Sequence, residues 1–223
     1  MPKAKIGLKL ELKVIKKEEI PHLLVPGEMG AVLELTVKDK NGKVTDHRVM
    51  RSKSFVRQFL ELLWIEFNKV SKYTPLMMQD TGGLGRNIYE NLINFTCDAG
   101  IGIVTNGIIV GTGTTAPTID DYAIETLIDH DAAPPTGGRL QYGGVAFGAP
   151  ASDATTSQFT ITRDFANNSG GAITVNEIGL YVKGLDTDVQ TRYFMTIRDV
   201  IGGGIAVPDG QTLTVNYREQ AVV

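Results

Sequence analysis

The sequence has little of the chemistry that most enzymes and metal proteins use. Its 223 residues include one cysteine, three histidines and one tryptophan. Cys97 cannot form a disulfide within the chain, and it has no companion Cys or His at zinc-ligand spacing. Long hydrophobic runs are also missing, because stretches such as 101–110 fall well short of the roughly 20 residues that a membrane-spanning helix needs. We therefore expect no metal site, no intrachain disulfide and no membrane insertion.

What the sequence does contain is typical of a globular protein with a sizeable core. Hydrophobic residues make up 42% of the chain and charged residues 21%, a balance that excludes disordered and collagen-like proteins. The N-terminus alternates charged and apolar residues, so it lacks the continuous apolar core of a secretory signal. We expect the chain to be synthesised in the cytoplasm.

Charge and glycine divide the chain into two parts. Residues 1–72 carry a net charge of +6 and the remainder a net charge of −9, while 21 of the 25 glycines follow residue 72. This asymmetry predicts an N-terminal domain over 1–76, a connecting segment over 77–106 and a C-terminal domain over 107–223. Opposite charges on two halves suit a head-to-tail assembly. A nucleic-acid-binding face is the less favoured alternative, because no aromatic residues interleave with the early lysines for base stacking.

The N-terminal part predicts a small α+β domain with one long helix. Ile6, Leu8, Leu10, Leu12 and Val14 recur at every second residue, which is the period of a half-buried strand. Residues 31–50 predict a β-hairpin, with Asn41 and Gly42 as the two residues of a type I′ turn. Apolar residues at three- and four-residue spacings over 54–70 predict an amphipathic helix.

The predicted helix allows two interpretations. Its apolar surface is wider than one stripe, since Leu62, Trp64 and Ile65 extend it, and Ser52 or Ser54 is available as the N-cap. The helix either covers the small N-terminal sheet or makes contacts between subunits. We favour the first interpretation, because a sheet of three strands needs a cover.

The C-terminal part predicts an antiparallel β-sandwich of the jelly-roll or Ig-like kind. Short apolar runs are separated by clusters of Gly, Pro, Asn, Asp and Thr, as in such folds. The expected strands lie at 107–110, 140–147, 158–165, 172–182, 191–200 and 211–217. Turns are expected at 166–171 and 208–210, and a short helix over 117–128 capped by Thr118. The whole chain is thus predicted to be mainly β.

No pattern of catalytic or ligand-binding residues stands out. The glycines around Gly111-Thr112-Gly113 match a dinucleotide fingerprint only loosely, without the alternating strands and helices that would support it. Asp129-His130-Asp131 is the one local titratable cluster, and we interpret it as a solvated loop because adjacent side chains on an extended segment diverge. The carboxylate pairs at 120–121 and 186–188 are interpreted as surface turns. We expect no catalytic residue, no metal ligand and no cofactor-binding residue.

Several short motifs of the second half nevertheless form a recognisable set. They are Ile109-Val110-Gly111-Thr112-Gly113, Asp120-Asp121-Tyr122, Gly138-Arg139-Leu140-Gln141-Tyr142, Phe159 with Ile161 and Arg163, Asn168-Ser169-Gly170, Ile173 to Tyr181 (ITVNEIGLY), Arg198-Asp199 and Val207 to Tyr217 (VPDGQTLTVNY). This set resembles virion structural proteins of tailed double-stranded DNA viruses of bacteria or archaea. Arg51 to Val56 (RSKSFV) resembles the same group less closely. The resemblance implies a β-rich protein that is built into rings or shells, and it brings no catalytic residues.

These observations lead to one favoured function and two rivals. We expect a non-enzymatic homo-oligomeric subunit of the virion tail, neck or collar, or capsid exterior, in contact with other virion proteins. The alternative is a capsid decoration protein or a module that binds host surface glycans through shallow aromatic sites such as Tyr142, Phe147 or Tyr193. A glycan hydrolase is disfavoured, because no paired catalytic signature is present. No specific nucleic acid is expected as a partner.

The first predicted strand suggests how subunits are joined. A strand over 6–14 can pair with the sheet edge of a neighbouring copy and staple the two copies through main-chain hydrogen bonds. On this hypothesis, deletion of residues 2–16 abolishes assembly.

Overall fold

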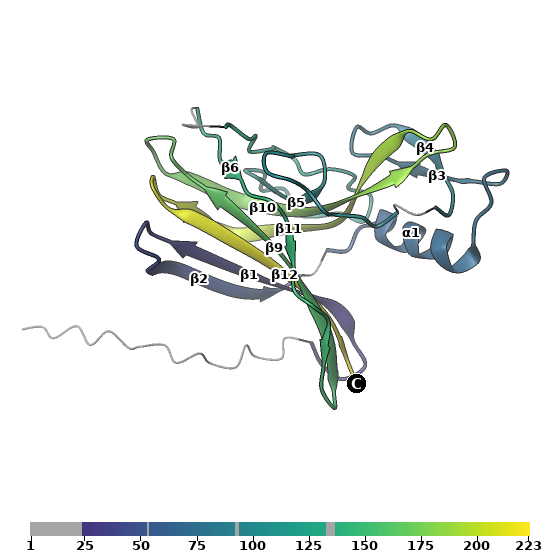
Figure 1. Ribbon diagram of the computed structural model, residues 1–223, viewed down its shortest axis with the longest axis horizontal. Coiled ribbons are helices and arrows are strands. Elements are labelled where there is room, and N and C mark those ends of the chain that lie inside the picture. Colours follow the sequence, from purple (N-terminus) through teal and green to yellow (C-terminus); the bar gives the residue numbers. More distant parts are fainter. Residues whose placement is uncertain (1–23, 53, 92–93, 133–136) are drawn as a thin grey trace, which may run out of the picture.

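The computed structural model describes residues 24–52, 54–91, 94–132 and 137–223, so the strand expected over 6–14 lies outside it. The chain is mainly β with antiparallel sheets, as predicted (Figure 1). The elements are β1 (Met29–Lys38), β2 (Val44–Arg51), α1 (Arg57–Asn68), β3 (Leu76–Gln79), β4 (Gly85–Ile88), β5 (Gly107–Gly111), β6 (Gln141–Tyr142), β7 (Ala146–Phe147), β8 (Ala151–Ser152), β9 (Thr156–Ala166), β10 (Ile173–Leu185), β11 (Thr191–Val207) and β12 (Thr212–Val222).

The largest sheet joins the two ends of the described chain. Its order is β2-β1-β12-β9-β6, and the short strands β7 and β8 also pair with β9. We call it sheet A. The C-terminal strand β12 lies between β1 and β9 and pairs with each along its length, from Met29 opposite Ala221 to Lys38 opposite Thr212 on the β1 side. One sheet therefore contains strands from both of the domains expected from the sequence, and the division into 1–76, 77–106 and 107–223 stays a prediction.

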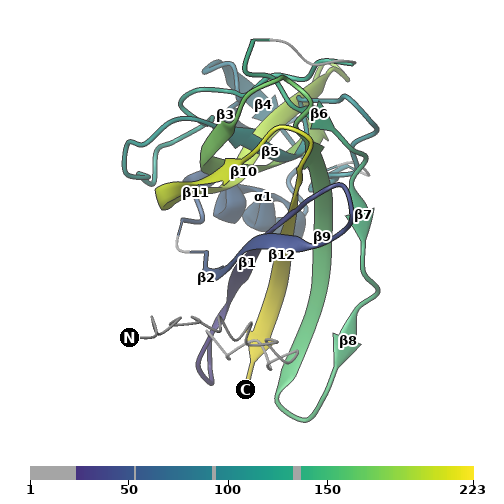
Figure 2. The same ribbon diagram turned by 90° about the vertical axis from the view of Figure 1, so that its left-hand side faces the viewer.

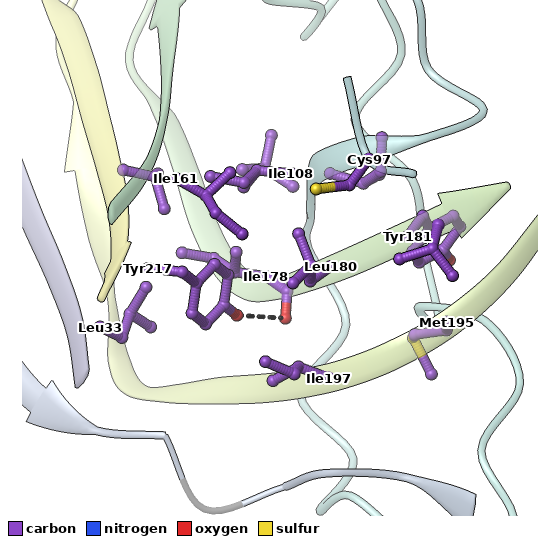
Figure 3. Close-up of a cluster of buried hydrophobic side chains, with 14 of the residues drawn as sticks. Leu33, Cys97, Ile108, Ile161, Ile178, Leu180, Tyr181, Met195, Ile197 and Tyr217 are labelled. Atoms are coloured by element: carbon purple, nitrogen blue, oxygen red, sulfur yellow. Dashed lines mark hydrogen bonds between the residues drawn. The ribbon is translucent and has the colours of Figure 1, made fainter. Parts of the chain in front are cut away.

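A second sheet, sheet B, has the order β11-β10-β5, and β3 and β4 form a separate hairpin. Side chains of sheets A and B meet in one core, in which Leu33, Ile161 and Tyr217 of sheet A face Leu180 and Ile197 of sheet B (Figure 3). Buried positions alternate along β9 and β12, and they are Ile161, Phe165, Leu213, Val215 and Tyr217.

The predicted hairpin is confirmed, but its turn is of another type. Only Gly42 adopts a positive φ, 79°, whereas a type I′ turn requires Asn41 to do so as well. The loop closes instead through a hydrogen bond from the Gly42 amide to the Asp39 carbonyl, and the Asp39 amide donates to the Lys43 carbonyl. This is the three-residue loop in which a glycine follows a type I turn.

The same loop occurs three times, each time built on an aspartate. Asp39, Asp80 and Asp186 each accept two backbone N–H groups from the residues two and four positions later, at 2.8–3.0 Å. In the second and third loops the other carboxylate oxygen binds Nε of Arg86 and of Arg192, both at 2.6 Å. The carboxylate expected at the surface at position 186 is therefore buried and fixes a turn.

Helix α1 is shorter than expected and begins later. Its N-cap is Val56 without a side-chain hydrogen bond, so the predicted Ser52 and Ser54 caps are wrong. The reason is a bridge between Phe55 and Ile197, which holds the preceding residues extended along β11. The helix covers the core with Gln58, Leu62 and Ile65 as its buried residues.

The short helix expected over 117–128 is absent from this described segment. A single turn takes its place, in which Asp121 accepts the Thr118 amide and hydroxyl at 3.0 and 2.8 Å. The described part of the chain contains no helix that is long and apolar enough to cross a membrane.

Candidate functional site

Among the described residues, the most fully buried carboxylate is that of Glu177 in β10. It accepts the backbone N–H groups of Gly113, Glu125 and Thr126 at 2.8–2.9 Å. Arg198 of β11 adds its Nε at 3.0 Å. Because the three amides belong to the segment 112–126, this side chain helps to hold that segment against sheet B, together with Tyr181 and Asn176 of the same strand.

The carboxylate also explains the glycines of the loose dinucleotide fingerprint. A Cβ at Gly111 would lie 2.6 Å from Oε1 of Glu177, and a Cβ at Gly113 would lie 2.5 Å from Cβ of Glu125. The glycines thus leave room for the protein's own carboxylates, a role for which no bound pyrophosphate is needed.

Arg198 continues the same network. Its guanidinium lies 2.7 Å from Asp121 and 3.0 Å from Glu177, and it is almost completely buried. Burial opposes ionisation of Asp121, but hydrogen bonds from Thr118 and Arg198 outweigh it and lower the pKa of this carboxyl. Asp121 is therefore a partner of a buried cation, whereas Asp120 pairs with Arg57 at 2.8 Å.

Arg163 is a second buried cation, and it binds carbonyl oxygens. It donates to the carbonyls of Gly100, Ile103, Asn106, Ile108 and Gly143 at 2.6–3.4 Å. Its guanidinium also lies 4.8 Å from the centre of the Tyr142 ring. Burial lowers the pKa of Arg163 to about 10. The residue ties the segment 100–108 to β9.

Asp129-His130-Asp131 does not converge on one point. Nδ1 of His130 accepts the Tyr142 amide at 3.1 Å, while Asp129 accepts the His130 amide at 2.8 Å. Asp131 instead lies 3.9 Å from Arg139. The cluster thus forms a local turn, and no group of three or more His, Cys, Asp or Glu side chains among the described residues is placed to hold a metal ion.

Of the aromatic residues expected to bind glycans, one is wrongly placed for that role. Tyr142 is buried, and its hydroxyl donates to the Ile128 carbonyl at 2.6 Å. Phe147 is half-exposed, and Tyr193 is partly buried in β11. Tyr142 therefore cannot contribute to the predicted shallow glycan-binding site.

An apolar groove of about 460 Å³ lies on the inner face of sheet A. One wall comes from sheet B and the segment before α1, and the other from the ends of β1, β9 and β12. Its apolar lining consists of Met29, Phe55, Phe59, Phe95, Cys97, Phe147, Pro150, Phe159, Ile161, Leu180, Val182, Ile197 and Ala221. We call it the inter-sheet groove.

Aromatic rings line much of the inter-sheet groove. Phe59 lies between Phe55 and Phe95, with ring centres 4.6 and 6.0 Å away. Phe147 and Phe159 remain 52% and 39% exposed. An uncovered apolar surface of this kind is a candidate site of contact with another molecule.

Two titratable residues also line the groove. Burial, reinforced by the charge of Asp98, raises the pKa of Cys97 to about 11, so the thiol is a small apolar side chain and a poor nucleophile. Burial, reinforced by the charge of Asp199, raises the pKa of Glu219 to about 7. The sequence pattern does not single out Glu219 as a site residue, although it occupies a core-facing position of β12.

A second exposed apolar surface runs along α1. Leu60, Trp64 and Phe67 are spaced by four and three residues, and they are 63%, 51% and 86% exposed. The helix therefore has an apolar stripe on each side, one toward the core and one outward. The inward stripe packs mainly against β11 and β3, so the helix covers a core as expected, but that core is not formed mainly by the β1–β2 hairpin. The outward stripe suits the interpretation as a subunit contact.

Comparisons with protein families, curated proteins and solved structures find no match for this chain.

Proposed function

We propose that this protein is a non-enzymatic structural subunit of a tailed virus particle. It is synthesised in the host cytoplasm and becomes part of the virion, where it forms symmetric homo-oligomeric contacts in the tail, the neck or collar, or the capsid exterior. The resemblance of its C-terminal motifs to virion proteins is the origin of this proposal.

The observation that carries the proposal is the contrast between buried charges and exposed apolar surface. Glu177, Arg163 and Arg198 are bonded to backbone groups or to one another, so they act as internal supports. The inter-sheet groove and the stripe Leu60-Trp64-Phe67 are apolar and uncovered. Such surfaces favour association with protein partners.

The proposal includes the finer fold expected from the sequence. Two antiparallel sheets that share one core are compatible with a β-sandwich. We propose that this sandwich is of the jelly-roll or Ig-like kind.

Native mass spectrometry of the purified full chain, over a series of salt concentrations, tests the proposed function. We expect discrete oligomers, and we expect their stability to change with salt because the two halves of the sequence carry opposite net charges. A monomer at every salt concentration contradicts self-assembly and favours the alternative role.

That alternative is a capsid decoration or glycan-binding module, and it is favoured by one observation. Phe147 offers an exposed aromatic ring beside the inter-sheet groove, which is the kind of surface that stacks on sugars. Binding of the full chain to a glycan array, lost in Phe147→Ala and retained in Leu60→Ala, supports this role. Absence of glycan binding counts against it.

A further inference from the structure

The inter-sheet groove exists because sheet A is longer than the part of it that sheet B covers. Figure 2 shows β9 and β12 continuing beyond β10 and β11 toward the C-terminus. Core-facing positions alternate along these strands. Phe159 lies two residues before the buried Ile161, and Glu219 and Ala221 lie two and four residues after the buried Tyr217, so all three share the core-facing side. The groove is thus a continuation of the core that no described element fills.

A segment outside the described residues has the matching chemistry. Ile6, Leu8, Leu10, Leu12 and Val14 alternate with mostly polar or charged residues. In an extended chain their side chains share one face, and residues 6–14 span roughly 27 Å. The extended segment would therefore present one apolar side, which matches the apolar lining of the inter-sheet groove.

Charge also favours this segment as the occupant. Residues 1–23 contain six lysines and three glutamates, a net charge of +3, so the remaining residues carry −6. The segment and the body of the protein therefore attract one another.

The direction in which the segment leaves the sheet points to a second copy. A Cβ at Gly30 would lie 3.3 Å from Leu24, whereas the next residue, Ala31, faces the core. Because neighbouring residues of a strand face opposite sides, Leu24 packs on the outer face of sheet A, away from the groove. To reach its own groove, the preceding chain has to pass around the end of the sheet. A copy packed against the outer face is reached directly, within the roughly 33 Å that residues 14–24 can span.

We propose that residues 5–15 of one copy lie as an extended strand in the inter-sheet groove of a second copy, with Ile6, Leu8, Leu10, Leu12 and Val14 directed into it. This inference rests on the proposed self-assembly and names the contact that produces it. Because donor segment and acceptor groove are different surfaces, repetition of the contact gives a head-to-tail ring or filament.

The experiment combines a synthetic peptide of residues 2–16 with four proteins. These are the full chain, a chain lacking residues 2–16, and both with Ala221→Arg, which places a long charged side chain in the groove at an exposed position. Asn41→Arg in the exposed β1–β2 turn is the matched control for the added arginine. Circular dichroism confirms that each variant is folded.

We expect the peptide to bind the shortened chain, and to bind at least tenfold more weakly when Ala221→Arg is present. A scrambled peptide without the alternation is expected not to bind. In native mass spectrometry the full chain and its Asn41→Arg variant are expected to form oligomers, while the shortened chain and the full-length Ala221→Arg variant are monomers.

Three results overturn the inference. Failure of the peptide to bind removes the groove as its site. Oligomers that persist without residues 2–16 show that another surface assembles the copies, and the proposed function then stands without this contact. A monomeric full chain, combined with peptide binding by the shortened chain alone, places the segment in its own copy and contradicts self-assembly as well.

Discussion

Glu219 makes the stability of this protein depend on pH. Its pKa is raised from an ordinary value of 4.5 to about 7 by burial and by the nearby Asp199. The folded state therefore holds a proton that the unfolded state releases, so stability falls as pH rises from about 4.5 to about 7 and stays lower above that. We expect Glu219→Gln to increase the free energy of unfolding at pH 8 by about 2 kcal/mol, with little effect at pH 4.

Urea denaturation of both proteins at the two pH values measures this difference. An equal effect of Glu219→Gln at pH 4 and pH 8 would show that the carboxyl titrates normally. Glu34→Gln, at an ion pair with Arg218 on the outer face of the sheet, is a suitable control.

Val189 is held in a backbone conformation that suits glycine. Its φ is 62°, at the position that Gly42 and Gly83 occupy in the two other aspartate-based loops. A β-branched residue in this region costs about 1–2 kcal/mol, part of which is offset by the greater entropy of an unfolded glycine. We expect Val189→Gly to stabilise the protein by about 1 kcal/mol in thermal or urea unfolding.

The reverse exchange is the control. A Cβ at Gly42 meets no atom within 4 Å, so Gly42→Val introduces the same backbone strain without a clash. We expect it to destabilise the protein by a similar amount. A destabilising Val189→Gly would instead mean that the valine side chain contributes contacts that outweigh the strain.

The important buried charges could have been located from the sequence, although their partners could not. Arg163 follows Ile161 and precedes Phe165 at core-facing spacing, and Glu219 follows Val215 and Tyr217 in the same way. A charged residue at such a position signals a buried polar contact. The partners come from loops far away in sequence, and periodicity carries no information about them.

Among the elements, the segment 112–126 is held to sheet B by several side chains, of which Glu177 makes the most backbone contacts. Glu177 binds three of its backbone amides, and this arrangement requires glycine at position 113. We expect Gly113→Ala to destabilise the protein by about 2–4 kcal/mol, because the added methyl group displaces a buried carboxylate from its donors. Urea denaturation measures the loss, and amide hydrogen exchange is expected to increase over 112–126.

Gly171→Ala is the matched control, since its Cβ would lie in open space and its backbone needs no positive φ. Its unfolding free energy should change by less than about 1 kcal/mol. If both glycines tolerate alanine equally, Glu177 does not fix the segment.

Element type was easier to predict from the sequence than element limits. The hairpin, the helix and most C-terminal strands are present, because alternation and helical spacing report directly on which face is buried. The expected strand over 140–147 is divided into β6 and β7, and the helix over 117–128 is replaced by a turn. Gly143 and Gly144 lie between β6 and β7, and the carboxylate of Glu177 in β10 binds the backbone amides of residues 125 and 126. Local helix or strand propensity does not describe either effect on the backbone conformation.

At the scale of the whole molecule, sheet A depends on the last residues of the chain. Removal of 212–223 takes away β12 and leaves β1 and β9 without their common neighbour. We expect the chain 1–211 to lose cooperative thermal unfolding, and the chain 1–222 to retain it. Circular dichroism and calorimetry distinguish the two, and a sharp transition in 1–211 would show that the sheet closes without β12.

The inter-sheet groove could not be predicted, because it results from the relative length of two sheets. The sequence of a single strand does not show whether the facing sheet extends far enough to cover its end. The apolar alternation over 6–14 was visible, but the structure was needed to show a surface of matching character.

The central place of β12 also has a consequence during synthesis. The β1–β2 hairpin leaves the ribosome well before its principal neighbour β12, which begins at residue 212. At ordinary elongation rates of about 5–20 residues per second, β12 is synthesised roughly 10–40 s after β1, and the edge of β1 that pairs with β12 stays unpaired during this time. The nascent chain therefore displays an unpaired strand edge until β12 has been made, and crowding of several ribosomes on one message brings identical edges close together.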